Sequence, residues 1–291
     1  MPIAEQGYIH WAGEFIAHPK PWRVIARHGI RQAFKRKFFK FLFSFSFLPA
    51  VIGLAGVYIS ERLEDFQFMV RGRDPSGFLK IGPESFRLYF ANDGLLFLMV
   101  MVLVLAGAGL ISDDLKFNSL QLYFSRPLRK RDYLGGKMLT LIFFLLLVTL
   151  VPGLLFVVFK VIFSGSFSFL AAYPWLPVSV VAFSLFLSVF LSVYTLLISS
   201  LSRNRRFVSI LIFLVYIFSD IFFGIFNGIF HNPVFSLLSI KSNIQQVAAA
   251  AFRVPPPQGI SWIYSLLVLC GIAAFGAWVL RKRTRSVEVI K

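Results

Sequence analysis

Residues 112–137 read SDDLKFNSLQLYFSRPLRKRDYLGGK, a charged segment between two apolar runs that are each long enough to cross a bilayer. Ser112 is expected to cap a helix whose first turn contains Asp113 and Asp114, where the helix dipole favours negative charge. Pro127 is expected to stop that helix, because proline disfavours helical geometry in the residue before it. One side of the helix carries the apolar residues Leu115, Phe117, Leu120 and Phe124. A short capped helix followed by a basic cluster predicts a docking element for a soluble partner.

The composition indicates a polytopic membrane protein. Hydrophobic residues make up 57% of the 291 residues and charged residues only 15%, against roughly 25% charged residues in a soluble domain. Six stretches have the length and apolar character of a membrane-spanning helix. They are residues 39–59, 94–111, 138–162, 177–201, 207–230 and 260–280. No internal repeat or low-complexity linker divides the chain, so we expect residues 1–291 to form a single all-α domain with six transmembrane helices.

The basic residues predict an orientation. Of the 30 lysines and arginines, 22 fall in the N-terminal tail, the 112–137 segment, the short connection at 202–206 and the C-terminal tail. Basic residues concentrate on the cytoplasmic side of membrane proteins, so both termini and residues 112–137 are expected there. Residues 60–93 and 231–259 are expected outside. The net charge of +17 therefore indicates this orientation and contact with anionic lipid head groups, and nucleic-acid binding is not expected.

Residues 21–38 predict a basic amphipathic helix. Pro21 suits a first helical position, and basic side chains recur every four residues. A helix of this kind lies in the membrane interface; the alternative is a plain cluster of charges that stops membrane transfer. The residues expected to matter in this helix are Trp22, Arg23, Arg27, Arg31 and Phe34.

The chain shows no catalytic or metal-binding pattern. A Gly-x-x-x-x-Gly-Lys-Ser/Thr phosphate loop is missing from the sequence, so the chain itself is not expected to bind ATP. The motifs of metallopeptidases and serine hydrolases are also missing. The four histidines are scattered over tails and loops, and the single cysteine, Cys270, lies inside an apolar run. We therefore expect no metal, no cofactor and no enzymatic activity in this chain.

Polar residues inside the spans leave two questions open. Asp220 is a formal charge within a predicted span, which usually means a functional residue facing the bundle interior or water. It is expected either to line a translocation path or to be a structural carboxylate bonded to Ser219, Tyr216 or a neighbouring span. Ser184, Ser188 and Ser192 form a seam along one helix face. Such a seam favours close helix packing, and the alternative is a polar strip along the path.

The 112–137 segment resembles the signature of the membrane subunit of type-2 ATP-binding-cassette (ABC) exporters. In that family an acidic pair opens a cytosolic coupling helix, and a Gly-Thr-Leu-like triplet, a Ser-x-Pro stop, a basic-acidic pair and a Gly-Lys follow. The corresponding residues here are Asp113-Asp114, Asn118-Ser119-Leu120, Ser125-Arg126-Pro127, Arg131-Asp132 and Gly136-Lys137. Asp stands where Glu is more usual, and Asn118 where Gly is common.

The resemblance implies partners and further elements. The docking residues would be Asp113, Asp114, Leu115, Asn118, Ser119, Leu120, Ser125, Arg126 and Pro127. They would contact a separate cytosolic ATPase that holds ATP and Mg²⁺, and a second permease copy or a homologue would complete the path in a prokaryotic inner membrane. Residues 21–38 would be the family's connecting helix. Residues 231–259 would form paired re-entrant helices, or else an ordinary outer loop.

Two other classes of function fit the sequence less well than an exporter. A membrane enzyme that modifies lipids would need a nucleophile or metal site at membrane depth, and none is visible in the sequence. An ATP-independent channel or secondary carrier often shows inverted repeats and ion ligands near the midplane, whereas this chain has no repeat and a single carboxylate within its spans. The short outer loops favour direct export of a small or amphipathic molecule.

Overall fold

The computed structural model describes residues 20–61, 81–120 and 128–283, which contain helices and their connections and no strand. This confirms the predicted all-α class for the described residues. The helices are α1 (Pro21–Phe34), α2 (Lys37–Phe45), α3 (Leu48–Glu61), α4 (Pro83–Phe90), α5 (Asp93–Gly107), α6 (Gly109–Lys116), α8 (Lys130–Ser164), α9 (Ser168–Ala172), α10 (Leu176–Ser199), α11 (Arg205–Phe230), the 3₁₀ helix η3 (Pro233–Leu238), α12 (Ile240–Ala251) and α13 (Trp262–Arg283).

The described residues contain six helical segments that are long and apolar enough to cross a membrane, as the sequence predicted. They are Lys37–Ser60, Pro83–Lys116, Lys130–Ser164, Leu176–Ser199, Arg205–Phe230 and Trp262–Arg283. The second segment is much longer than the predicted stretch 94–111, because α4 and α6 extend α5 at its two ends. Asn92 marks the join between α4 and α5, where its side chain accepts hydrogen bonds from the N–H groups of Gly94 and Leu95.

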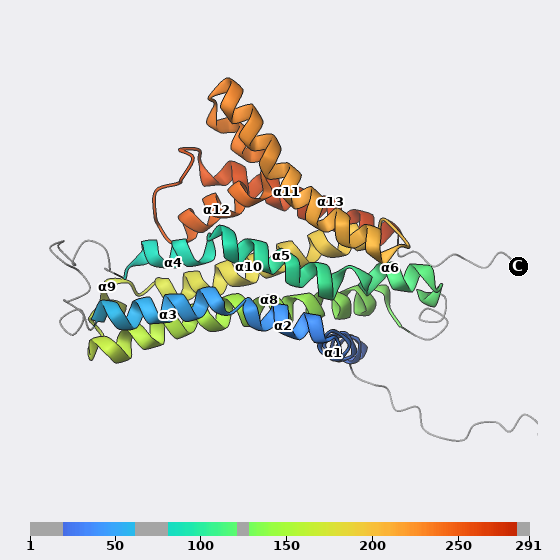
Figure 1. The fold of residues 1–291 in the computed structure, drawn as a ribbon, viewed down its shortest axis with the longest axis horizontal. Coiled ribbons are helices and arrows are strands. Elements are labelled where there is room, and N and C mark those ends of the chain that lie inside the picture. Colours follow the sequence, from blue (N-terminus) through green and yellow to red (C-terminus); the bar gives the residue numbers. More distant parts are fainter. Residues whose placement is uncertain (1–19, 62–80, 121–127, 284–291) are drawn as a thin grey trace, which may run out of the picture.

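Helices α8 and α10 form the centre of the bundle. α8 contacts α1, α3 and α10, and α13 packs against α10 and α12. In Figure 1, α3, α5, α8 and α10 run along the long axis of the molecule, and α1 is seen end-on across one end of them. Helix α11 leans away from this bundle, so much of its surface is left without a neighbour in the single chain.

Aromatic packing holds the N-terminal helices on the bundle. The ring of Phe144 on α8 lies 4.9 Å from that of Phe39 and 5.4 Å from those of Phe34 and Phe43, centroid to centroid. All three contacts are edge-to-face, the arrangement that aromatic pairs prefer. Phe34, expected in the interfacial helix, therefore attaches the end of α1 to the membrane-spanning core.

The segment 231–259 contains two short helical elements, η3 and α12. Ser239 separates them, and its hydroxyl caps α12 by accepting a hydrogen bond of 3.0 Å from the N–H of Ser242. Phe252, directly after α12, stacks on Phe90 of α4 at 5.3 Å. Because η3 contacts α11, and α12 contacts α11, α13 and α4, the segment is packed into the bundle along most of its described length.

Candidate functional sites

Helix α1 lies directly against the beginning of α8, and two glycines allow this approach. A Cβ atom at Gly136 would lie 2.7 Å from the Cβ of Ile25 and 2.8 Å from the carbonyl oxygen of Trp22. A Cβ atom at Gly29 would lie 2.6 Å from the hydroxyl of Thr140. These separations are shorter than van der Waals contact, so only glycine permits α1 to lie this close to α8.

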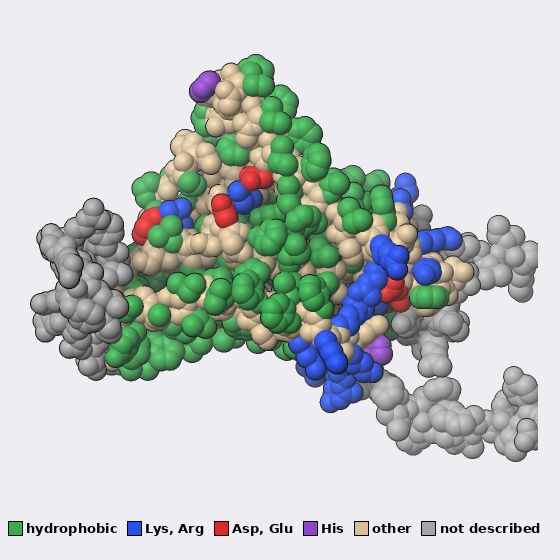
Figure 2. Space-filling view, viewed as in Figure 1, with side chains coloured by type: hydrophobic (Ala, Val, Ile, Leu, Met, Phe, Trp, Pro, Cys, Tyr) green, Lys and Arg blue, Asp and Glu red, His purple; other side chains and the backbone are tan. Residues whose placement is uncertain are grey.

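The amphipathic helix predicted over residues 21–38 is present as α1, which begins at Pro21 and ends at Phe34. Ala26, Gly29 and Ala33 are buried on one side. The exposed basic residues are Arg23, Arg27, Arg31 and Lys35. Figure 2 shows lysine and arginine side chains gathered at the end of the bundle where α1 and α6 lie. The helix thus turns a charged surface outward across one end of the molecule, as an interfacial helix does.

The predicted start of the docking helix is wrong. The helix does not begin at Ser112: α6 begins at Gly109 and ends at Lys116, so Asp113 and Asp114 lie in its second half. The Ser112 hydroxyl donates a 2.7 Å hydrogen bond to the carbonyl oxygen of Ala108, which is a bond inside the helix rather than an N-cap. The physical reason is that the helix of the second span continues past its apolar run, with a single break at Ala108.

The predicted helix is also not continuous toward Pro127: α6 ends at Lys116, and a tight turn follows at Asn118. Its φ of 53° is in the left-handed region, which asparagine and glycine tolerate better than other residues. Phe117, one residue earlier, has 70% of its surface exposed at this end of the molecule. Helical geometry resumes at Ser119 and Leu120. The next residues lie outside the described part of the chain, among them the predicted docking residues Ser125, Arg126 and Pro127.

The two acidic residues of α6 have different surroundings. One carboxylate oxygen of Asp114 accepts a 2.7 Å hydrogen bond from the Tyr133 hydroxyl and lies 2.9 Å from the Lys137 ammonium, both on α8. The side chains of Asp114 and Lys137 are each only 13% exposed. Asp113 is partly buried, as Asp114 is, and its charge acts on the Arg36 guanidinium. Asp114 therefore joins α6 to α8.

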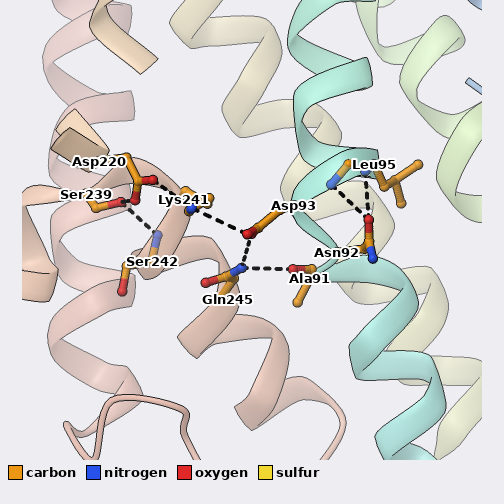
Figure 3. Close-up of polar contacts among 10 residues, drawn as sticks. Ala91, Asn92, Asp93, Leu95, Asp220, Ser239, Lys241, Ser242 and Gln245 are labelled. Atoms are coloured by element: carbon orange, nitrogen blue, oxygen red, sulfur yellow. Dashed lines mark hydrogen bonds and ion pairs between the residues drawn. The ribbon is translucent and has the colours of Figure 1, made fainter. Parts of the chain in front are cut away.

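A second polar cluster, partly exposed in the single chain, surrounds the predicted residue Asp220 (Figure 3). One carboxylate oxygen of Asp220 lies 2.7 Å from the ammonium of Lys241 on α12, and the other accepts a 3.0 Å hydrogen bond from the Ser239 hydroxyl. The same ammonium lies 3.6 Å from Asp93 at the start of α5. The amide of Gln245 donates to Asp93 at 2.8 Å. Three helices thus meet at one charged cluster.

This charged cluster has one cation between two carboxylates. Burial alone lowers the pKa of Lys241, but the hydrogen bond and charge of Asp220, with those of Asp93, outweigh it and raise the pKa. Lys241 is therefore charged, and by formal charge the cluster has two acidic side chains to one basic side chain. The side chains of Asp220 and Asp93 are 33% and 68% exposed in the single chain. The cluster consequently needs a second surface or water beside it.

The sequence singled out Asp220 and suggested Ser219, Tyr216 or a neighbouring span as its partners. The Ser219 hydroxyl donates to the carbonyl oxygen of Tyr216 at 2.7 Å and accepts from the N–H of Ile240 at 3.3 Å. The neighbouring element that binds Asp220 is α12, through Lys241. The sequence analysis missed Lys241; the signal that could have found it is a single lysine within a moderately apolar segment that has little other charge.

The chain matches the family model for the ABC-2 family transporter protein over residues 10–285. This chain belongs to the ABC-2 transporter family. Members of this family are multi-pass membrane subunits of transporters and have no catalytic domain. No curated protein matches the chain.

The serine seam of this ABC-2 protein lies in the interior of the bundle. Ser184, Ser188 and Ser192 on α10 have no exposed surface, and their hydroxyl oxygens have no hydrogen-bond partner among the described residues. A polar strip along an open path would be wetted, so this burial favours the packing interpretation. Thr195 lies on the same face of α10. A Cβ atom at Gly107 of α5 would overlap the Thr195 side chain, which shows how closely α5 and α10 approach.

Proposed function

We propose that this chain is the membrane subunit of an ATP-driven exporter, and that a dimer of permease chains forms the path. Each chain, expected to be one domain throughout, would bind a separate cytosolic ATPase that supplies ATP and Mg²⁺. The observation that carries the proposal is the ABC-2 family match over residues 10–285. The position of α1 and α6 at the same basic end of the bundle supports it, because a single soluble partner there would reach both elements.

The proposed orientation has this basic end in the cytoplasm of a prokaryotic cell. The positive-inside rule supports it, because α1, the N-terminus of α11 and the C-terminus of α13 are rich in lysine and arginine. Residues 231–259 would then enter the membrane from its outer side. The packing of α12 between spans supports the interpretation that η3 and α12 are re-entrant helices rather than an ordinary loop.

Helix α11 is the proposed contact with the second permease chain. Apolar residues are exposed along its length, including Phe218, Phe222 and Ile225 at 46–51%. Asp220 lies among them, and a rise of about 1.5 Å per residue places it roughly 22 Å along the helix from Arg205. A net negative cluster at that depth is costly against lipid. We therefore assign Asp220 and its partners to the dimer interior, beside the translocation path.

The mechanism follows from these positions. ATP binding would close the ATPase dimer and move the two α6 segments that dock on it. The spans would then shift from one global state to the other. The size of this shift would depend on how much more tightly ATP binds to the complex in one state than in the other. The substrate would be a small or amphipathic molecule.

Purification of the chain from its native membrane tests this function. A phosphate-loop ATPase should co-purify with it, and ATP hydrolysis should depend on the assembled complex. Asp113→Lys with Leu120→Pro should reduce ATPase binding or stimulation, whereas Gln258→Ala in the outer segment should leave both unchanged. Isolation of the chain without any ATPase would contradict the proposal.

A further inference from the structure

Ser199, the last residue of α10, makes three hydrogen bonds to the break between α5 and α6. Its hydroxyl accepts from the N–H of Ile111 at 3.1 Å and from the N–H of Ser112 at 3.2 Å, and donates to the carbonyl oxygen of Ala108 at 2.8 Å. A hydroxyl has one donor and two acceptor positions. Its whole capacity is therefore used on one turn of another span, and Ser199 has no exposed surface.

Other helices bind the same break one turn earlier. The guanidinium groups of Arg36, between α1 and α2, and Arg205, at the start of α11, donate to the carbonyl oxygen of Leu105 at 2.8 Å and 3.4 Å. The break in the second span is thus held from three sides. Among these contacts, Ser199 alone bonds on both sides of the first turn of α6, to Ala108 and to Ser112.

We propose that Ser199 is a positioning residue that makes α6 move as one body with α10. The inference rests on the proposed function, in which the ATPase moves α6. Without the hydroxyl, the first turn of α6 would lose its attachment to α10 and bend at Ala108. When the ATPase moves the docking segment, α6 would then bend at Ala108 and α10 would not move with it. Helix α13 is attached to the end of α10, because Arg283 donates to the carbonyl oxygen of Ser200 at 3.1 Å. If α10 does not move, α13 would not move either.

The test uses the complete permease–ATPase complex in nanodiscs, with the native Cys270 replaced by alanine. One reporter cysteine replaces Phe117 at the docking end, and in a second protein another replaces Val178 at the far end of α10; both positions are exposed, at 70% and 69%. Maleimide labelling rates are measured without nucleotide and with ATP plus vanadate. With Ser199 intact, both rates should respond to ATP.

In Ser199→Ala the response at position 117 should remain, and the response at position 178 should fall about fivefold or more, the usual size of a coupling between sites. Ser200→Ala is the matched control. Its hydroxyl is equally buried but donates back to its own helix, to the carbonyl oxygen of Leu197 at 2.7 Å, so both responses should remain. A response at position 178 that is unchanged in Ser199→Ala would overturn the inference.

Hydrogen exchange in the unmodified complex gives a second readout that needs no variant. The amides of Ile111 and Ser112 should stay protected both without nucleotide and with ATP plus vanadate, because the proposed joint stays closed. Faster exchange there on ATP binding would show that the break opens and would refute the role of Ser199. A complex without ATPase, or without any ATP response when Ser199 is intact, would instead contradict the proposed function itself, and this inference with it.

Discussion

At the scale of single residues, two ion pairs in the described part of the chain differ in their exposure. Asp114 binds Lys137 with both side chains 13% exposed, whereas Asp220 binds Lys241 with the side chains 33% and 22% exposed. A partly exposed pair contributes less than a buried one, because water screens its charges. The two pairs should therefore respond differently to mutation.

Breaking the ion pair between Asp220 and Lys241 should destabilise the protein moderately. Lys241→Met leaves Asp220 and Asp93 together without a cation, and we expect a loss of about 1–2 kcal/mol, below the value for a fully buried pair. The double variant Lys241→Met, Asp220→Leu should recover part of that loss, because neither charge is then unpaired. Thermal unfolding in detergent measures both. The control is Glu84→Gln, which removes the exposed pair with Arg87 and should not change the unfolding temperature measurably. If Lys241→Met is as stable as the unmodified protein, Lys241 does not stabilise the fold through this cluster.

The role of the Asp220 charge in transport is a separate question. Asp220→Asn keeps the shape of the side chain and part of its hydrogen bonding but removes its charge. If the charge faces the path, transport should fall while expression and ATPase assembly stay intact. Normal transport by both Asp220→Asn and Asp220→Leu would remove Asp220 from the path.

The acidic pair of α6 should separate into a structural and a docking residue. Asp114→Lys places a cation against Lys137 and breaks the bond to Tyr133, so we expect a cost of about 3 kcal/mol or more and a loss of folded protein. Asp113→Lys should keep the fold and weaken ATPase stimulation. The yield of monodisperse protein and the ATPase rate of the complex give the two readouts. Equal yields for the two variants would contradict this division.

At the scale of elements, the contact between α1 and α8 depends on backbone approach. Gly136→Ala should destabilise the protein, because the new methyl group would meet Ile25 and the Trp22 carbonyl. Gly135→Ala is the matched control: nothing lies within 4 Å of its Cβ position, and alanine gains up to about 1 kcal/mol over glycine inside a helix. The melting temperatures of the two variants should move in opposite directions, and parallel shifts would disprove the close approach.

The exposed face of α11 is predicted to contact the second permease chain. With Cys270 replaced, a cysteine at Phe222 should form a covalent dimer under mild oxidation, because we place this face against the second chain. A cysteine at Val158 on α8 is comparably exposed, at 50%, and should stay monomeric. Dimer formation at Val158 but not at Phe222 would move the interface elsewhere. If the second chain is a homologue, the Phe222 variant should instead cross-link to that homologue.

At the scale of the whole molecule, the orientation can be tested directly. Single cysteines at Leu120 and at Phe167, in the connection between α8 and α9, lie at opposite ends of the bundle. In intact cells, a reagent that does not cross membranes should label position 167 and should reach position 120 only after the cells are opened. Labelling of position 120 from outside would reverse the proposed orientation and remove the ATPase from its proposed docking surface.

The sequence alone determined the number of spans, the helical class and the amphipathic helix α1. Each of these depends on residues that are close together in the chain, such as an apolar run or basic residues every four positions. A helix near residues 112–120 was predicted for the same reason, and α6 lies there. Its starting residue was predicted wrongly, because Ser112 looks like a cap only if the preceding helix stops, and that helix continues to Lys116.

Only the tertiary structure decided which polar groups meet. The partners of Asp220, Asp114 and the Ala108 break are 21, 23 and 91 residues away in the sequence, at Lys241, Lys137 and Ser199. Apolar periodicity places a residue on a helix face but does not say which helix that face will contact. That choice depends on packing, on glycines such as Gly136 that let one helix approach another, and on the need to pair every charge that the apolar bundle encloses.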